Sequence, residues 1–268
     1  MRSGLARILD QILVLRARDY PPEALSRSAL VFAPHQDDET LGCGGTIILK
    51  KSAGARLGIV FMTDGGTSHS RLMAPETVAE IREQEALSAA GMLGLESSDV
   101  HFLRFSSKEL RDHKDEATSQ VLAILGKQQP EEIFIPHALE PPADHATTNR
   151  IVRGAVEQRG VRVQVFEYPI WFWEHFPWMR SHIYNPRTRR AMCRWSLQAL
   201  GHTMLKMGWK IWVGDVIEQK RRALQEYRSQ MTQLVDDPRW QTLPEVSNGD
   251  FLARFLGKFE FYRGYILG

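Results

Sequence analysis

The sequence predicts an α/β fold in which a mostly parallel, Rossmann-like sheet is flanked by helices. Two observations support this prediction. Short apolar runs of strand length alternate along the chain with longer segments of helical periodicity, a pattern typical of parallel sheets covered on both faces. The chain also has 268 residues, of which 43% are hydrophobic and 25% charged, which is enough to bury a full-sized core without disulfide or metal staples.

The first half of this pattern contains two strand–helix units. Residues 28–33 form an apolar run that indicates a buried strand, and residues 42–53 follow as a helix entered through a glycine-rich turn. Residues 56–63 form a second apolar run, which ends at an Asp-Gly-Gly turn. Residues 75–93 have helical periodicity, and Gly94 stands where a helix C-cap is expected.

The pattern continues with three further strands and two helices. We expect strands at residues 100–105, 132–136 and 161–168, and helices at residues 117–127 and 144–158. Because the carboxyl ends of parallel strands meet at one edge of a sheet, ligands of such folds bind there. The loops that follow the strands are therefore the first place to look for a site.

Beyond residue 168 the regular alternation lapses. We expect a helix at residues 194–207, a short strand at 210–213, a long charged helix at 216–234 and an aromatic tail at 251–267. These segments predict a C-terminal elaboration of the sheet rather than a second domain of its own.

Tryptophan and basic residues concentrate in one stretch of this elaboration. Residues 171–231 hold 11 of the 34 Lys and Arg against 4 acids, and six of the seven Trp. Three interpretations stay open: a lid or a contact between copies of the chain, a sugar-binding rim, or a patch that sits at an anionic bilayer surface. We expect one domain over residues 1–268, with residues 171–212 as an inserted lid or interaction segment.

Composition and charge exclude several functional classes. A net charge of +2 without a recognisable module does not predict nucleic-acid binding. Cys43 and Cys193 cannot form a disulfide framework, which favours a reducing intracellular compartment. No apolar segment reaches the roughly 18 residues of a transmembrane helix, and residues 1–15 lack the features of a signal peptide. We expect a cytoplasmic protein, with membrane association as the open alternative.

Residues 1–15 instead predict an amphipathic helix. Its apolar face is expected to carry Leu5, Ile8, Leu9 and Ile12.

A cluster of histidine and acids follows the first predicted strand. Residues 33–39 read A-P-H-Q-D-D-E, and three adjacent acids repel one another and are costly to desolvate unless a divalent metal relieves both effects. His35 offers a nitrogen and one of Asp37 and Asp38 an oxygen, a ligand mix that suits zinc, while the other Asp would stay off the metal as a base. His145, after the fourth strand, would complete a His-Asp-His set with open positions for water and substrate, the pattern of a catalytic site.

Some of these residues also have purely structural interpretations. Asp38 or Thr40 could cap the helix that follows, and Asp144 could cap the helix that contains His145. Cys43, without an arranged partner, is expected to be a small buried thiol rather than a nucleophile.

Five blocks of the sequence carry a family resemblance. The first, residues 33–46, reads A-P-H-Q-D-D-E-T-L-G-C-G-G-T. The others are T-D-G at 63–65, R-E-Q-E-A at 82–86, P-A-D-H at 142–145 and K-R-R-A-L-Q-E-Y-R-S-Q at 220–230. In this order and spacing they resemble the signature blocks of the PIG-L/LmbE-like zinc-dependent N-deacetylases (GlcNAc deacetylase-like).

The resemblance implies a LmbE-like fold and zinc-dependent hydrolysis of an N-acyl group. By position, His35, Asp38 and His145 match the family's metal ligands, and Asp37 matches its general base. Zinc lowers the pKa of a bound water to about 7 and acts as a Lewis acid on the carbonyl, so the metal-bound water would be the nucleophile. Asp37 would take its proton and pass it to the leaving amine.

Further residues are expected around this centre. Arg82 matches a residue on the family's substrate side, Asp64 lies at a strand end that faces the site, and Tyr227 is a third substrate-side candidate. Asp144 and Glu39 are expected to orient the metal ligands without contacting the metal themselves.

Two positions depart from the family pattern. Gln36 replaces the usual Pro and is expected to loosen the loop. Pro142 stands where the family often has the first His of H-P-D-H, a residue credited with assisting the oxyanion or the leaving group. Candidates to replace it are His137, Glu140 and Tyr227, and His137 is the first choice as a catalytic residue because it directly follows a strand.

The resulting functional expectation is a metal-dependent hydrolase that removes the acetyl group of a GlcNAc-type amino sugar or its conjugate. Zn²⁺ is the expected cofactor, although nitrogen and oxygen ligands accept other divalent metals. The expected partner is an amino-sugar-containing small molecule or glycolipid, not nucleic acid; a homo-oligomer or peripheral membrane contact through residues 171–212 stays open. The alternatives are an amidase on a larger N-acylated conjugate, and an inactive relative that binds a sugar or a membrane.

Overall fold

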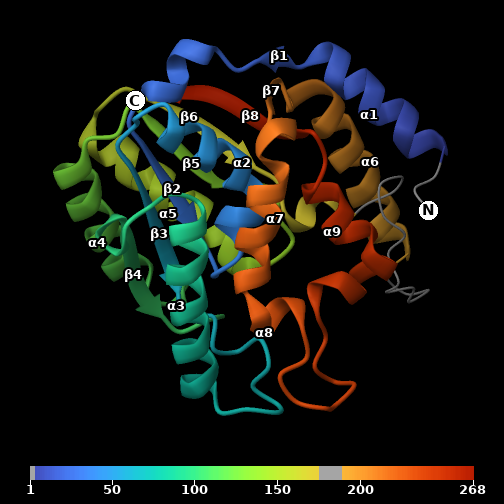
Figure 1. The fold of residues 1–268 in the computed structure, drawn as a ribbon. Helices are drawn as coiled ribbons and strands as arrows, with labels where there is room; N and C mark the ends of the chain where they lie inside the picture. Colours follow the sequence, from blue (N-terminus) through green and yellow to red (C-terminus); the bar gives the residue numbers. More distant parts are fainter. Residues whose placement is uncertain (1–3, 175–188) are drawn as a thin grey trace.

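A mixed sheet of eight strands forms the centre of the computed structural model, which describes residues 4–174 and 189–268 (Figure 1). The strand order is β1-β7-β8-β6-β5-β2-β3-β4. The neighbours β4, β3, β2, β5 and β6 are all parallel, whereas β8 runs antiparallel to both β6 and β7. The predicted α/β class with a mostly parallel sheet is confirmed.

The elements follow the predicted alternation from β2 to β6. The strands are β1 (Arg18–Asp19), β2 (Ala29–Ala33), β3 (Leu57–Thr63), β4 (Val100–Phe105), β5 (Glu132–Pro136), β6 (Val163–Tyr168), β7 (Trp209–Trp212) and β8 (Phe259–Leu267). The α-helices are α1 (Gly4–Arg16), α2 (Asp38–Ser52), α3 (Pro75–Met92), α4 (Lys114–Gln128), α5 (Ala143–Arg159), α6 (Arg189–Lys206), α7 (Ile217–Glu226), α8 (Arg228–Met231) and α9 (Asp250–Phe255). Short 3₁₀ helices are η1 (Pro22–Ser26), η2 (Ser97–Asp99), η3 (Trp171–Trp173), η4 (Gly214–Val216) and η5 (Leu243–Gly249).

Side chains of the central strands alternate between two hydrophobic cores. In β2, Val31 and Ala33 pack in the core that contains α2, α3 and α7, whereas Leu30 and Phe32 pack in the core that contains α4 and α5. Figure 1 shows α3 and α7 in front of the sheet, with α5 behind it. Because both faces of β2 are covered, the strand is apolar throughout rather than alternating.

The sheet order creates a crevice beside β2. This strand pairs with β3 on one side and with β5 on the other, so the chain leaves β2 and β5 in opposite directions. Loops diverge at such a switch point and leave room for a ligand at the carboxyl ends of the strands. The loop after β2 with the start of α2, and the start of α5 after β5, contain the two blocks in which we expected the metal ligands.

Helix α2 begins earlier than predicted. It starts at Asp38 rather than at residue 42, so Asp38 and Glu39 lie in its first turn, where negative charge is favourable next to the helix dipole. The prediction that Asp38 or Thr40 caps this helix is wrong, because Asp37 is the N-cap residue and makes no side-chain capping hydrogen bond. Cys43 is fully buried as expected, and burial raises the pKa of its thiol well above the usual range.

The C-terminal part differs most from the prediction. The long helix expected at residues 216–234 is broken at Tyr227, whose ψ of 61° is not helical, and the second piece ends at Met231. The aromatic tail is not irregular, because it contains α9 and the sheet strand β8.

The amphipathic helix expected at the N-terminus is present as α1, but much of its expected apolar face is open to solvent. Leu5, Ile8 and Ile12 are exposed, and the side chains that α1 buries are Ala6 and Leu13. Of the four residues of the expected apolar face, only Leu9 packs against the core, so this face only partly matches the one that is buried.

Strand β8 is tied to α2 by a buried polar network. Glu260 accepts hydrogen bonds from the main-chain N–H groups of Gly45 (2.8 Å) and Thr46 (2.9 Å). Lys220 from α7 lies 2.7 Å from the same carboxylate and also donates to the carbonyl oxygen of Leu41 (2.8 Å). Two segments from the end of the chain thereby fix the helix that begins with Asp38.

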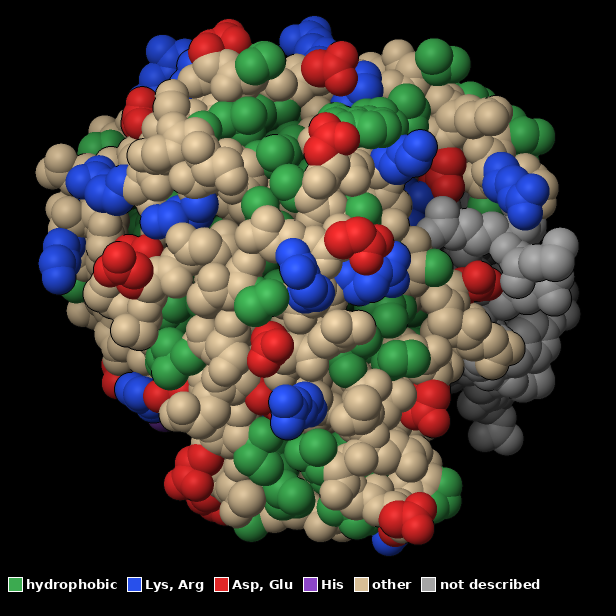
Figure 2. Space-filling view, viewed as in Figure 1, with side chains coloured by type: hydrophobic (Ala, Val, Ile, Leu, Met, Phe, Trp, Pro, Cys, Tyr) green, Lys and Arg blue, Asp and Glu red, His purple; other side chains and the backbone are tan. Residues whose placement is uncertain are grey.

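The surface carries no large field of one sign on the face shown in Figure 2, where acidic and basic side chains are interspersed. None of the helices within the described ranges is long and apolar enough to cross a bilayer. The segment proposed as a lid, residues 171–212, lies partly outside the described residues. Its described parts are η3, α6 and β7, of which β7 is a strand of the central sheet.

Candidate metal centre

Three predicted ligands meet at the crevice beside β2. His35 lies in the loop after β2, Asp38 opens α2, and His145 lies in the first turn of α5. One ligand atom from each lies within 4.8 Å of the others. The Asp38 carboxylate stands between the rings, 3.3 Å from Nδ1 of His35 and 3.3 Å from Nε2 of His145. Two imidazoles and a carboxylate therefore converge on one point.

The donor set fits a divalent cation. Nε2 of His145, which faces the Asp38 carboxylate, is buried and has no hydrogen-bond partner, an arrangement that costs free energy unless a further partner binds. Although burial works against a charged ring, the carboxylates of Asp144 and Asp38 raise the pKa of His35 to about 9, so the surroundings favour positive charge at this point. Nitrogen and oxygen ligands of this kind suit zinc and several other divalent metals.

Each ligand imidazole has a second carboxylate behind it. Nε2 of His35 lies 3.1 Å from Asp144, whose carboxylate also accepts from the main-chain N–H of Lys108 (3.0 Å). Nδ1 of His145 lies 3.4 Å from Oε2 of Glu140. Carboxylates in this position orient ligand imidazoles and fix their tautomers. Asp144 does not cap α5, since the N-cap residue is Pro142.

Asp37 lies next to this centre in an unusual backbone conformation. Its φ is 135°, a region that non-glycine residues rarely adopt and that is held only where surrounding contacts enforce it. Its N–H donates to the Glu39 carboxylate (3.1 Å), and its own carboxylate is almost fully buried. Burial raises the pKa of Asp37 to about 7, while the Arg82 guanidinium, 3.5 Å away, acts in the opposite direction. A carboxylate with these surroundings can accept and release a proton near neutrality.

Arg82 and Gln36 hold the loop that contains Asp37. Arg82 donates to the carbonyl oxygens of Gln36 and Gly65, and it is buried. The Gln36 side chain donates to the carbonyl oxygen of Thr63 at 2.9 Å. The prediction that Gln36 loosens this loop is therefore wrong, because its amide ties the loop to the end of β3.

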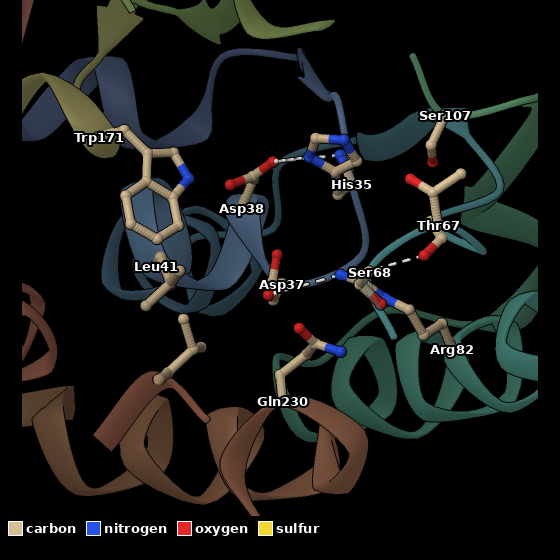
Figure 3. Close-up of a pocket in the computed structure, with 12 residues that line it drawn as sticks. His35, Asp37, Asp38, Leu41, Thr67, Ser68, Arg82, Ser107, Trp171 and Gln230 are labelled. Atoms are coloured by element: carbon tan, nitrogen blue, oxygen red, sulfur yellow. Dashed lines mark hydrogen bonds and ion pairs between the residues drawn. The ribbon is translucent and has the colours of Figure 1, made fainter. Parts of the chain in front are cut away.

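A pocket of about 210 Å³ opens over the centre, and its two sides differ in character. Figure 3 shows Trp171 and Leu41 on one side and the hydroxyls of Thr67 and Ser107 on the other, with His35, Asp37 and Asp38 between them. The amide of Gln230 approaches from a third side. An apolar wall opposite a row of hydroxyl groups matches a ligand with one apolar and one hydroxylated face.

Arg82 lines this pocket, whereas Asp64, Tyr227 and His137 are not part of its described lining. Asp64 accepts from the main-chain N–H groups of Gly66 (3.0 Å) and Ser107 (3.2 Å), so it shapes the two loops. The Tyr227 hydroxyl donates to Glu39 at 2.5 Å, and both side chains are fully buried.

His137, our first choice to replace the family's histidine, is fully buried in another environment. Its Nε2 lies 3.2 Å from Nδ1 of His202, and its ring lies 4.4 Å from that of Phe172. We therefore assign no catalytic role to His137.

Sequence reasoning did not name Gln230 or Ser107 as site residues, and it placed Trp171 only in a segment for which a sugar-binding rim was one of three interpretations. Gln230 ends the last signature block, so its place in that block was a usable signal. Trp171 follows β6 by three residues, and a strand end was a further signal. Ser107 follows β4 by two residues, so the same signal applied to it, and its hydroxyl also donates to Asp64.

Residues 30–156 match the family described as "PIG-L: GlcNAc-PI de-N-acetylase". This segment runs from β2 to α5 and contains the three candidate ligands and Asp37. It thus covers the parallel strands β2 to β5 and the three candidate ligands, but neither β6 nor the C-terminal elaboration.

Two curated relatives match overlapping parts of the chain. Over 121 residues it is 28% identical to a diacetylchitobiose deacetylase of Thermococcus kodakarensis, covering 44% of this chain and 44% of that protein. Over 142 residues it is 30% identical to a probable N-acetyl-alpha-D-glucosaminyl L-malate deacetylase 2 of Bacillus cereus, covering 50% of this chain and 63% of that protein. The chain therefore spans only about half the length of these relatives.

A solved structure resembles nearly the whole chain. The N,N'-diacetylchitobiose deacetylase from Pyrococcus horikoshii superposes with a TM-score of 0.66 at 21% identity, covering 98% of this chain and 91% of that one. At this identity the likeness establishes the fold, and it extends to the C-terminal elaboration that the family match leaves out.

Proposed function

We infer from the membership of residues 30–156 in the PIG-L family of GlcNAc-PI de-N-acetylases that this chain is a metal-dependent N-deacetylase. The proposed substrate is an N-acetylated amino sugar of the GlcNAc type, or a conjugate of one. The observation that carries the proposal is the convergence of His35, Asp38 and His145 beside the separate carboxylate of Asp37, at the base of a pocket that His35, Asp37 and Asp38 line.

His35, Asp38 and His145 would hold the cation, with zinc as the first candidate. When bound, it supplies a Lewis acid for the acetyl carbonyl and a positive charge that favours the ionised form of Asp37. Asp144 and Glu140 keep the two imidazoles in the orientation that presents a nitrogen to the centre.

Asp37 is the proposed proton carrier of the reaction. The oxygen of a water molecule attacks the acetyl carbon while the Asp37 carboxylate accepts a proton from that water. The bond between carbon and nitrogen then breaks, and Asp37 passes the proton to the nitrogen that leaves as an amine. The products are acetate and the free amino sugar, and Asp37 returns to its starting form.

The pocket walls support a sugar as the substrate. The flat face of Trp171 and the side chain of Leu41 suit the apolar face of a pyranose, and the hydroxyls of Thr67, Ser68 and Ser107 suit its hydroxyl groups. The names of both curated relatives, which refer to diacetylchitobiose and to a glucosaminyl malate, agree with an N-acetylglucosamine unit at this position.

Pro142 supports a second candidate, an inactive relative that binds a sugar. It occupies the position of the family's assisting histidine, and neither His137 nor Tyr227 is among the described residues that line the pocket. Such a protein would bind metal and N-acetylglucosamine without releasing acetate.

The test is acetate release from a panel that contains N-acetylglucosamine, diacetylchitobiose and an N-acetylglucosaminyl malate. The protein is stripped with a chelator, and metal content is measured before and after zinc is restored. We expect acetate from at least one substrate, lost on chelation and recovered with zinc. A protein that binds zinc and the sugars yet releases no acetate would favour the inactive relative.

A further inference from the structure

The Glu140 carboxylate accepts hydrogen bonds from three consecutive main-chain N–H groups that lie about 30 residues further along the chain. Glu140 lies in the loop between β5 and α5, and its side chain is buried. Oε1 accepts from the N–H groups of Ile170 (2.7 Å) and Phe172 (3.2 Å), and Oε2 accepts from that of Trp171 (2.8 Å). These donors lie at the start of η3, where the N–H groups of a helix lack partners within the helix. The carboxylate therefore fixes the backbone on which the indole of Trp171 stands.

The same carboxylate faces a candidate metal ligand. Oε2, which accepts from Trp171, lies 3.4 Å from Nδ1 of His145. The opposite nitrogen of this ring, Nε2, lies 3.3 Å from Asp38. A proton on Nδ1 would leave the Nε2 lone pair directed at the Asp38 side, as a metal ligand requires.

We propose that Glu140 is a positioning residue that fixes both the orientation of the metal ligand His145 and the position of the pocket wall at Trp171. This proposal rests on the proposed function only in taking His145 as a metal ligand. One oxygen atom of Glu140 serves both groups, so a change at this oxygen disturbs both. Asp144, the carboxylate behind His35, is not linked to the wall at Trp171, since its other hydrogen bond comes from the N–H of Lys108, next to Ser107 on the opposite side of the pocket.

The distinguishing experiment compares Glu140→Gln with Glu157→Gln. Glutamine keeps the size of the side chain but removes its charge, and an NH₂ group replaces one of the two acceptor oxygens. Glu157 is exposed near the end of α5, the helix that contains His145. It lies 12 residues and about 18 Å beyond His145, so its variant controls for the loss of one charge.

The first readout is zinc affinity, measured by competition with a chromophoric chelator. We expect Glu140→Gln to bind zinc roughly 10- to 100-fold more weakly than the wild type, the usual effect of losing a carboxylate behind a ligand imidazole. Glu157→Gln should stay within about twofold. The second readout is the ¹⁹F spectrum of protein labelled with 5-fluorotryptophan, in which Trp171→Phe identifies one resonance. That resonance should shift or broaden in Glu140→Gln and not in Glu157→Gln.

Neither readout requires turnover, so a protein that never releases acetate can still confirm the proposal. Zinc affinity and the Trp171 resonance both at wild-type values in a folded Glu140→Gln would overturn it, as would a change in only one of them. Should Glu140→Gln fail to fold, Glu140→Asp replaces it. This side chain keeps its charge but is one methylene shorter, so we again expect both readouts to change, and two unchanged readouts would reject the shared role.

Discussion

The Asp37 carboxylate lies 3.5 Å from the guanidinium of Arg82, although both side chains are almost fully buried. A buried ion pair is retained at a cost of desolvation, so its place beside three candidate ligands points to function rather than to stability. Arg82 also holds two loop carbonyls, and the geometry of Asp37 therefore depends on several contacts at once.

Asp37→Asn should reduce acetate release by a factor of about 10² to 10⁴, the usual contribution of a general base, while the protein still binds zinc. Asparagine tolerates a positive φ, so the loop conformation should persist. Initial rates and metal content measure the two effects. Asp112→Asn, in an exposed loop before α4, is the matched control and should keep wild-type rates. Unreduced activity in Asp37→Asn would remove Asp37 from the mechanism.

Gly65→Ala should lower both stability and activity. Gly65 has a φ of 69°, and a Cβ there would collide with Oε1 of Gln36 and lie 3.0 Å from Nε of Arg82. Gly54 is the matched control, since its φ is 79° but no atom lies within 4 Å of the added Cβ. We expect Gly54→Ala to cost about 1 kcal/mol of backbone strain with full activity, and Gly65→Ala to cost more. Urea denaturation measures the free energy of unfolding, and acetate assays measure the activity. Equal losses in the two variants would show that the contacts of Gly65 do not matter.

Lys220 and Glu260 should show strong coupling in a double-mutant cycle. Both are buried, and their charged atoms lie 2.7 Å apart. Lys220→Met or Glu260→Gln alone leaves the other group without its partner, which costs about 3–5 kcal/mol. The double variant should lose much less than the sum of the two, as measured by the free energy of unfolding in urea. Additive losses would mean that the pair acts through separate contacts.

His69 should make stability depend on pH below about 6.5, the usual pKa of a histidine in an unfolded chain. Its ring stacks on Trp240 at 4.0 Å, and burial lowers its pKa. The folded state therefore binds fewer protons, so the stability contributed by His69 is present above pH 6.5 and is lost as pH falls toward its folded pKa. The difference between wild-type and His69→Gln unfolding free energies, measured from pH 5 to 8, should shrink in acid. A pH-independent difference would contradict this assignment.

The parts of the fold that follow local patterns could be predicted from the sequence. Strand β2 is apolar throughout and β3 to β6 are mostly apolar because the sheet is covered on both faces, and the cluster at His35, Asp37 and Asp38 is contiguous in the chain. Strand β8 was harder to predict because its Glu260 is buried, and the contacts that make that burial tolerable come from Lys220 and from the main chain of Gly45 and Thr46.

The support of the site depends on contacts between distant segments and was harder to foresee. Glu140 appears in the sequence as one acid before two prolines, and its partners at residues 170–172 become visible only when β5 and β6 are paired. His137 follows a strand as a site residue would, yet the loop turns its ring toward His202 instead. Position after a strand predicts proximity to the site, but not the direction of a side chain.

The placement of β8 between β6 and β7 has a consequence for synthesis on the ribosome. Strands β2 to β6 pair only with one another and with β8, so they can assemble as they emerge. Strands β7 and β1 reach the rest of the sheet only through β8, so β1, the first of the described strands to be synthesised, must wait for β8, the last of them. Until then the outer edge of β6 stays unpaired, which makes this interval the most vulnerable period for misassembly with another nascent chain.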